Sequence, residues 1–397
     1  MIRIRTVDQL EITPGARVFY RVDYNVPLDG GRITDATRIE ETLPTLHLLR
    51  ERGAAIVLAS HLGRPKGERK EKYSLQPVRE KLAEMTGLPV EWSPDCVGDE
   101  AERNAGALGA GQMLLLENLR FHPGEEKNDG AFAAALRKLG EIYVNDAFGA
   151  SHRAHASIDA LPRLLPKDHT AGGLLLEREL QFLQKVTQVA ERPFVALLGG
   201  AKIAGKIEPL EALIRLADKV LIGGGMANTF LAAQGRPMGG SLVDAGSIEV
   251  AGRILSGDSG AKLILPADLV VADSLENPAK IEQVDAAAGL RDDQKAFDIG
   301  PATVKRFSGE LLEAKIIFWN GPMGVFEKEA FAKGTMAMAR AVAESEAVSV
   351  VGGGESVEAV KASGFADRIS HISTGGGASL EFISGATLPG VEVLREG

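Results

Sequence analysis

Residues 18–28 read Val-Phe-Tyr-Arg-Val-Asp-Tyr-Asn-Val-Pro-Leu, and this stretch predicts the class of fold. Apolar residues alternate from Val18 to Val22, which is typical of a β-strand, and the polar Asp23 and Asn25 follow where that strand would end. Polar residues at strand ends, followed by a turn, mark ligand sites in open α/β sheets. We therefore expect an α/β fold with a site for a small charged molecule at the edge of its sheet.

A second predicted strand ends in the same way. The apolar run at residues 56–59 is followed by Ser60, His61 and Arg64, and the last two suit an anion. Two such strand ends within the first 65 residues strengthen the prediction of a pocket for a small charged molecule.

Short runs rich in valine, isoleucine and leucine recur along the chain, each followed by a turn and a helical pattern. Runs of this kind predict buried parallel strands. Each half of the chain therefore predicts a Rossmann-like, doubly wound parallel sheet. The runs cover residues 18–22, 54–59, 113–116 and 142–144 in the first half, and 195–198, 220–222, 263–265, 316–319, 348–351 and 371–372 in the second.

The length of 397 residues is too great for one core, so two domains are expected. We assign residues 1–172 to the first domain and residues 190–382 to the second. Residues 173–189 place their apolar side chains on one helical face and are interpreted as an interdomain helix. The tail, from about 383 to 397, is expected to pack back on the first domain.

Composition narrows the functional classes. The chain is 45% hydrophobic and 25% charged, as globular proteins are, and its one cysteine, Cys96, fits a reducing cytoplasm and is expected to be inert. Residues 1–10 lack the apolar core of a signal peptide, and no run approaches the roughly 20 apolar residues of a membrane span. The net charge of −9 argues against a nucleic-acid partner.

The two halves differ in the residues that bind anions. Seventeen of the 26 arginines and six of the seven histidines lie in residues 1–190, whereas 29 of the 46 glycines lie in residues 191–397. Arginine presents forked donors to carboxylate and phosphate, and glycine lets the backbone approach a phosphate chain closely. The first half is therefore predicted to bind a carboxylate or phosphate group through arginine side chains, and the second half to bind a phosphate chain through glycine-rich backbone.

Residues 200–206 read Gly-Ala-Lys-Ile-Ala-Gly-Lys and fit the spacing of a phosphate-binding P-loop, but Ile207 stands where that motif needs a magnesium-binding serine or threonine. The alternative is a strand-to-helix turn with two solvated lysines. Because Lys202 and Lys206 are four residues apart, we expect them on one face of a helix's first turn, where the helix dipole also attracts anions.

Three triple-glycine segments, at residues 223–225, 352–354 and 375–377, each follow a predicted strand. Tight turns could explain any one of them, but together they predict a nucleotide groove at the carboxyl edge of a sheet. Glu355, next to the second segment, is a suitable magnesium ligand, because Mg²⁺ takes one or two carboxylates plus phosphate oxygens.

The first half also carries a basic set just past strand ends, and no general base accompanies it. Each arginine alone is more typical of a solvated or ion-paired surface group; their repeated placement favours a shared anion site. If the chain transfers a phosphoryl group and the acceptor is a carboxylate, that acceptor is already ionised and needs no base, so positioning and cations would suffice. The set comprises Arg38, His61, Arg64, Arg120, His152 and Arg153.

Taken together these motifs resemble the phosphoglycerate kinase family. The resemblance implies two Rossmann-like domains with a cleft between them, the first for 3-phosphoglycerate or 1,3-bisphosphoglycerate and the second for Mg-ADP or Mg-ATP. It also implies closure of that cleft by the interdomain helix, and a monomer. The matching segments are residues 21–28, 61–65, 116–121, 144–157, 199–207, 221–228, 298–301, 319–327, 352–356 and 373–382.

The resemblance implies roles for individual residues. Arg38, Lys202, Lys206 and Gly376 would serve the transferring group, and Glu355 would hold Mg²⁺. Substrate binding is carried over to Asp23, Tyr24, Asn25, Arg38, His61, Leu62, Gly63, Arg64, Arg120 and Arg153. Nucleotide binding is carried over to Gly200, Ala201, Lys202, Lys206, Gly224, Gly225, Asn320, Glu327, Gly352, Gly353, Gly354, Glu355 and Ser356.

Two rival functions are weighed against this one. A nicotinamide-dependent dehydrogenase would need a third fingerprint glycine where Asn228 stands. A two-domain small-molecule binding protein would need neither a magnesium carboxylate nor two phosphate lysines. The chain also departs from the family pattern, because Glu355 replaces a usual aspartate and Gly205 replaces a usual polar residue.

Overall fold

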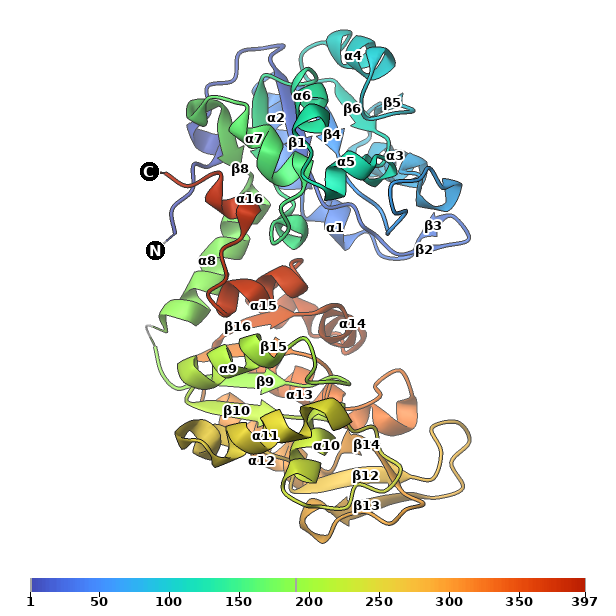
Figure 1. Cartoon of the computed structure of the whole chain (residues 1–397), viewed down its shortest axis with the longest axis vertical. Coiled ribbons are helices and arrows are strands. Elements are labelled where there is room, and N and C mark those ends of the chain that lie inside the picture. The colour runs from blue at the N-terminus through green and yellow to red at the C-terminus, as the bar shows by residue number, and fades with distance from the viewer. Residues whose placement is uncertain (1, 190, 397) are drawn as a thin grey trace. The chain divides into compact units, whose positions relative to one another are not determined.

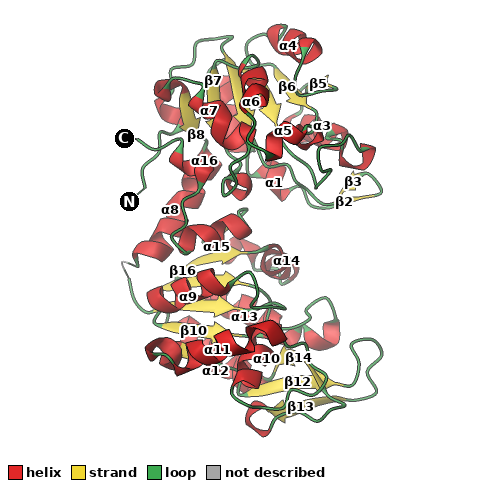
Figure 2. Ribbon diagram, in the orientation of Figure 1, coloured by secondary structure: helices red, strands yellow, loops and turns green. Residues whose placement is uncertain are grey.

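The computed structural model describes residues 2–189 and 191–396, which form two compact units (Figure 1). Unit 1 comprises Met1–Gln181 together with Thr387–Gly397, and unit 2 comprises Phe182–Ala386. Each unit contains a six-stranded parallel sheet with helices on both of its faces (Figure 2). The predicted class, two parallel-sheet α/β domains, is confirmed.

The sheet of unit 1 has the strand order β5-β6-β4-β1-β7-β8. Its central strand β1 (Arg17–Arg21) pairs in parallel with β4 (Ala55–Ala59) on one side and β7 (Ile142–Asn145) on the other. The remaining strands are β5 (Glu91–Ser93), β6 (Met113–Leu116) and β8 (Thr170–Gly172), with a small hairpin of β2 (Leu28–Asp29) and β3 (Arg32–Ile33). The α-helices are α1 (Thr37–Glu40), α2 (Leu43–Glu51), α3 (Gln76–Thr86), α4 (Asp99–Gly106), α5 (Pro123–Glu126), α6 (Gly130–Arg137), α7 (Leu161–Arg163) and α16 (Pro389–Glu392).

The sheet of unit 2 has the order β11-β10-β9-β15-β16-β17, which in chain order is 3-2-1-4-5-6, the Rossmann arrangement. Its strands are β9 (Phe194–Leu198), β10 (Lys219–Ile222), β11 (Leu263–Ile264), β15 (Ile316–Asn320), β16 (Val348–Gly352) and β17 (His371–Ile372). The strand order reverses between β9 and β15, and ligands bind at such a reversal in open α/β sheets. The helices are α9 (Ile207–Leu216), α10 (Gly224–Ala233), α11 (Ile248–Ser256), α12 (Pro301–Leu312), α13 (Lys333–Glu344), α14 (Gly354–Ala362) and α15 (Gly377–Ile383).

Unit 2 also contains an antiparallel sheet that the sequence analysis missed. It consists of β12 (Asp268–Ala272) between β13 (Ile281–Asp285) and β14 (Lys295–Ile299). Strand β13 alternates exposed and half-buried residues, because one of its faces is solvated, so it lacks the continuous apolar run of a buried parallel strand. A search for such runs therefore passes over it.

Helix α8 (Leu174–Gln188) is the helix expected between the domains, and the boundary between the units falls within it, after Gln181. Its apolar stripe is buried, with Leu176, Leu180 and Leu183 each at most 2% exposed. Residues from Thr387 onward belong to unit 1, where Gly390 donates its amide to the Ser151 carbonyl and Leu394 accepts from the Arg5 amide. Within the described residues, no helix has the length and apolarity needed to span a bilayer.

Candidate functional site

Polar side chains of unit 1 gather where four strands end. Asp23 follows β1, His61 follows β4, Arg120 follows β6, and Arg153 lies in the segment after β7. These strands are neighbours and run parallel, so their carboxyl ends share one edge of the sheet. The structure thus brings together residues that are up to 130 positions apart in the sequence.

Asp23 is the acidic residue of this edge. Its carboxylate forms an ion pair with Arg38, and its Oδ1 lies 3.8 Å from the Nε2 atom of His61 and accepts the Asn25 amide at 3.2 Å. Burial alone would raise the pKa of Asp23, but Arg38, His61 and Arg21 together hold that pKa well below its usual range. Asp23 is therefore ionised and can accept hydrogen bonds only.

His61 is buried at 4% exposure, and its tautomer follows from its partner. The Nη2 atom of Arg21 lies 3.3 Å from the Nδ1 atom of His61. A guanidinium can only donate, so Nδ1 accepts and the proton of the neutral ring is on Nε2. Burial lowers the pKa of His61 well below its usual value, and Arg120, Arg21 and Arg38 lower it further against the opposing effect of Asp23. His61 therefore offers one N–H beside a carboxylate.

Behind His61 lies a buried ionic network that the sequence analysis did not predict. Arg21 and Glu125 are both fully buried, with Arg21 Nη2 and Glu125 Oε1 3.8 Å apart. Ser157 bridges them: its Oγ accepts from Arg21 Nε at 2.8 Å and donates to Glu125 Oε1 at 2.6 Å. The signal was present in the sequence, because Arg21 is a charged residue inside a strand that is buried on both faces.

Arginines of the predicted set differ in what surrounds them. Arg120 is buried, donates to the Gly63 carbonyl at 2.9 Å and lies 3.5 Å from Glu126. Burial, together with the neighbouring cations Arg21 and Arg153, lowers its pKa to about 10 against the opposing effect of Glu126. Such mutual repulsion among cations is relieved when an anion binds. Arg64 is exposed, and within residues 2–189 and 191–396 no hydrogen bond or ion pair joins it to this group.

Two residues predicted to contact substrate, Tyr24 and Leu62, have buried side chains. The Tyr24 side chain is fully buried, with its hydroxyl 2.9 Å from the Thr42 hydroxyl, and the Leu62 side chain is 3% exposed. Only their main chains could meet a substrate. The backbone of Gly63 links two other predicted substrate-binding residues. Its amide donates to Asn25 Oδ1 at 2.8 Å, and its carbonyl accepts from Arg120.

A pocket of about 650 Å³ lies in unit 2 at the reversal of strand order. Six residues predicted to bind nucleotide line it: Gly200, Ala201, Gly224, Gly225, Glu327 and Glu355. Its walls also include apolar side chains, among them Val243, Leu269 and Phe297, so it suits a flat base with a charged tail. Lys295 and Asp298 line it as well, and the sequence analysis did not assign either to the site.

The predicted lysine pair is not on a helix. Helix α9 begins at Ile207, Lys206 is its N-cap residue, and Lys202 lies in the turn before it. The turn persists because Gly205 has φ +78°, a left-handed conformation that ends any helix started at Lys202. Lys206 Nζ donates to Asn320 Oδ1 at 3.2 Å, and burial lowers its pKa although Glu355 opposes the change.

Two glycines of the segment 223–225 pack closely against the backbone of the loop at residues 200–201. A Cβ on Gly224 would lie 2.9 Å from the Gly200 backbone, and one on Gly225 would lie 2.6 Å from the Ala201 carbonyl. The two loops therefore touch through their backbones, and this contact alone requires glycine. In contrast, a Cβ on Gly354 or Gly376 would meet nothing within 4 Å.

The segment around Glu355 divides into binding and structural residues. Ser356 is fully buried and its Oγ accepts the Gly321 amide at 2.5 Å, so this side chain holds a loop and does not face the pocket. Glu355 and Glu327 are exposed at the pocket wall. An exposed carboxylate beside a partly buried lysine fits a Mg²⁺ ion shared with phosphate oxygens.

Fold and geometry together define the class. The chain is a two-unit α/β protein with a cluster of cationic side chains suited to an anion in one unit and a pocket suited to a nucleotide in the other. A sequence profile of the phosphoglycerate kinase family matches residues 7–386. The chain therefore belongs to the phosphoglycerate kinase family, which confirms the resemblance seen in its motifs.

Individual relatives agree with this membership. The phosphoglycerate kinase of Moorella thermoacetica is 51% identical over 393 residues, covering 98% of this chain and 99% of the relative. That of Koribacter versatilis is 53% identical over 388 residues, covering 95% and 96%. The solved phosphoglycerate kinase structure from Coxiella burnetii superposes with a TM-score of 0.87 at 37% identity over 99% of each chain.

Proposed function

We propose that this chain catalyses reversible, Mg²⁺-dependent phosphoryl transfer between 1,3-bisphosphoglycerate and ADP, giving 3-phosphoglycerate and ATP. Phosphotransferase activity with a carboxyl group as acceptor follows from family membership. The observation that supports the residue assignment is the difference between the two sites. Unit 1 gathers buried cations around Asp23, whereas unit 2 has a large, partly apolar pocket beside Lys206. The dehydrogenase and binding-protein alternatives are not favoured.

In unit 1 each donor or acceptor suits one group of phosphoglycerate. The ionised Asp23 would accept from the hydroxyl, and the Nε2 proton of His61 would be donated to an oxygen beside it. Arg120 and Arg153 would bind the phosphate that is not transferred, because forked guanidinium donors match its oxygens. Arg38, paired with Asp23 and part-exposed, would reach the reacting carboxylate.

In unit 2 the apolar wall would hold the base, and Glu327 would bind the ribose. Lys206 would donate to the nucleotide phosphates from its position beside Asn320, with Gly200 close to its ammonium. Glu355 would hold Mg²⁺ together with phosphate oxygens, and the ion would supply charge neutralisation. Lys202, exposed in the turn before α9, would also donate to the phosphates.

The chemistry asks little of the protein beyond position and charge. The acceptor is a carboxylate, which is ionised at neutral pH and needs no general base. Arg38 and Lys206 would stabilise the charge on the transferring group, which is the main contribution in reactions of this kind. The turn at Gly376 leaves its backbone open for the same group.

Several expectations stay predictions. These are the cleft between residues 1–172 and 190–382, its closure through residues 173–189, the monomeric state and the cytoplasmic location. The single cysteine of the chain supports a reducing compartment.

The test is turnover of Mg-ATP and 3-phosphoglycerate, with the acyl phosphate coupled to NADH oxidation. Arg38→Ala should lower kcat by at least about 100-fold, a typical loss when one donor to developing charge is removed, and leave nucleotide binding unchanged. Arg103→Ala, an exposed arginine on α4, is the matched control and should keep full activity. The absence of any Mg²⁺-dependent turnover in the wild type would refute the activity, and retained turnover in the Arg38 variant would remove Arg38 from the reacting centre.

A further inference from the structure

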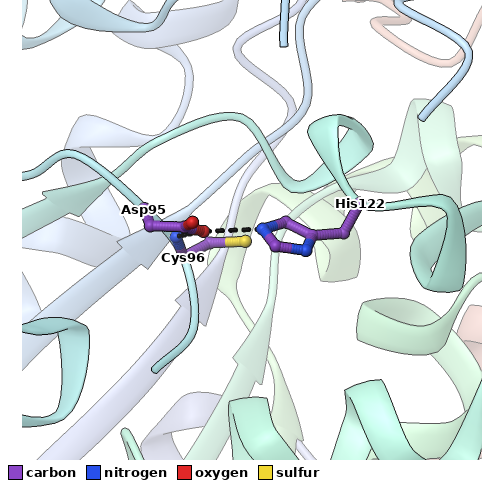
Figure 3. A group of neighbouring side chains, drawn as sticks. All are labelled: Asp95, Cys96 and His122. Carbon is purple, nitrogen blue, oxygen red and sulfur yellow. Dashed lines mark hydrogen bonds and ion pairs between the residues drawn. The ribbon is translucent and has the colours of Figure 1, made fainter. Parts of the chain in front are cut away.

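Three side chains with different ligand atoms meet in unit 1 outside the residues assigned to phosphoryl transfer. Asp95 and Cys96 lie in the loop between β5 and α4, and His122 precedes α5 (Figure 3). The Asp95 carboxylate oxygen, the Cys96 Sγ and a ring nitrogen of His122 all lie within 4.8 Å of one another. His122 Nε2 is already 2.6 Å from Asp95 Oδ1, so the imidazole and the carboxylate face each other.

The combination of sulfur, nitrogen and oxygen ligands selects a class of metal. Zinc accepts all three, with bonds of about 2.3 Å to sulfur and about 2.0–2.2 Å to nitrogen and oxygen. Neighbouring ligand atoms in a tetrahedral site then stand roughly 3.3–3.7 Å apart. The present separations lie on both sides of these values, because His122 Nε2 and Asp95 Oδ1 are 2.6 Å apart and no pair of ligand atoms is more than 4.8 Å apart. Mg²⁺ prefers oxygen ligands and is disfavoured here.

Two carboxylates, those of Asp95 and Glu125, lie near the buried cysteine. Cys96 is 1% exposed, and burial, with Asp95 and Glu125 nearby, raises the pKa of its thiol. The same negative charges that oppose a bare thiolate attract a metal cation. The positive group facing this loop is Arg69, whose Nη1 donates to the Pro94 carbonyl at 2.7 Å and whose Nη2 is 3.7 Å from Glu117.

The buried sulfur can be reached by an ion from solvent, and neighbouring contacts fix the orientation of the ligand residues. The side chains of His122 and Asp95 are 31% and 47% exposed, so the ion can enter from their side. The loop is fixed by Ser93 Oγ, which donates to the Asp95 carbonyl at 2.6 Å, and the His122 ring stacks on Phe132 with centroids 5.2 Å apart. Ligands oriented in this way bind metal more tightly than free side chains do.

We propose that Asp95, Cys96 and His122 form a Zn²⁺ site, with water as the fourth ligand. Binding breaks the hydrogen bond between Asp95 and His122. The proton on His122 Nε2 moves through water to Nδ1 of the same ring, which frees the Nε2 lone pair for the ion, and the thiol proton of Cys96 is released to solvent. The ion would tie the loop after β5 to the segment that carries Arg120 and Glu125. It would therefore stabilise unit 1 at the base of the phosphoglycerate site without touching the reacting groups.

The test uses Co²⁺ as a spectroscopic substitute for zinc on the full-length protein. A cobalt–thiolate bond produces a near-ultraviolet charge-transfer band, and because the chain has one cysteine the band can arise only at Cys96. We expect one equivalent of Co²⁺ to produce the band, Zn²⁺ to abolish it by displacement, and excess Mg²⁺ to leave it unchanged. No band in the wild-type protein would overturn the proposal.

Variants separate the site from adventitious binding. Cys96→Ser should remove the band, and His122→Gln should weaken Co²⁺ binding by at least about tenfold, the lower range for perturbed metal shells. His47→Gln, an exposed histidine on α2, is the matched control and should bind as the wild type does. Zn²⁺ should raise the thermal midpoint of the wild type and the control only. Unchanged Co²⁺ affinity in the His122 variant, or an equal thermal shift in all four proteins, would overturn the proposal.

Discussion

Replacing Glu125 by glutamine tests the buried network behind His61. In the folded protein Glu125 accepts from the Ser157 amide at 2.9 Å and from its hydroxyl at 2.6 Å, and faces the fully buried Arg21. Glutamine keeps the shape, removes the charge and turns one acceptor into a donor that faces Ser157. The guanidinium of Arg21 then loses the carboxylate that faces it, and Asp23 is the ionised group that remains near it.

The size of the loss follows from these contacts. Removing one partner of a buried ion pair costs about 3–5 kcal/mol. Arg21 keeps its bonds to Ser157 Oγ and the Val22 carbonyl, so we expect the lower end, about 3 kcal/mol of unfolding free energy. The neighbouring Glu126 is the matched control. Its side chain is 38% exposed and 3.5 Å from Arg120, so Glu126→Gln should cost less than about 1 kcal/mol.

The assay is urea unfolding of unit 1 followed by tryptophan fluorescence. The chain has two tryptophans, Trp92 in unit 1 and Trp319 in unit 2, so a Trp319→Phe background leaves Trp92 as the reporter. Both glutamine variants are compared in that background. Equal unfolding midpoints for the two variants would refute the reasoning, because they would show that Arg21 does not depend on the charge of Glu125.

Three further predictions concern unit 2. Lys206→Ala should lower kcat by about 100-fold or more, because the ammonium would stabilise charge on the transferring group. The unfolding free energy of unit 2 should stay within about 1 kcal/mol of the wild-type value, because the ammonium is not a packing group. Steady-state kinetics that show a change in KM alone would contradict this prediction. Burial raises the pKa of Asp298 to about 7, so its contribution to stability is complete below about pH 4 and is lost as the pH rises through 7. Between pH 4 and 8 the unfolding free energy of the wild type should therefore fall relative to that of Asp298→Asn. A difference between the two proteins that does not change with pH would contradict the raised pKa of Asp298. Gly321→Ala should destabilise unit 2 by more than about 2 kcal/mol, because φ is +97° and a Cβ would lie 2.2 Å from the Gly199 carbonyl oxygen. The control Gly354→Ala should change urea unfolding little, because a Cβ there meets nothing within 4 Å. Equal effects of the two substitutions would show that the loop around Gly321 adapts.

Most of the fold could be predicted because parallel strands buried on both faces leave continuous apolar runs. All ten predicted runs coincide with strands, such as 113–116 with β6. The short β5 and β8 and the antiparallel sheet were missed. Residues 281–285 read Ile-Glu-Gln-Val-Asp, and half-solvated strands of this kind do not differ in composition from surface loops.

The polar residues that the sequence places at strand ends, such as Asp23 and His61, lie close together in the structure. Their supporting partners were not, because contacts such as Arg21 to Glu125 join residues 104 positions apart. Local rules also misplaced Lys202, since the left-handed φ of Gly205 overrides the four-residue spacing. Burial, which sequence alone does not give, places the Tyr24 and Ser356 side chains in the interior.

The return of residues 387–396 to unit 1 has a consequence for how the protein is made. The Arg5 amide bonds to the Leu394 carbonyl, and the Asn145 side chain donates to the Gly390 carbonyl at 3.3 Å. A ribosome therefore begins unit 1 first but completes it last, after every residue of unit 2 has been synthesised. During translation unit 2 has its whole sequence available earlier, and the nascent unit 1 must wait with an unfilled place beside Ser151 until its final segment emerges.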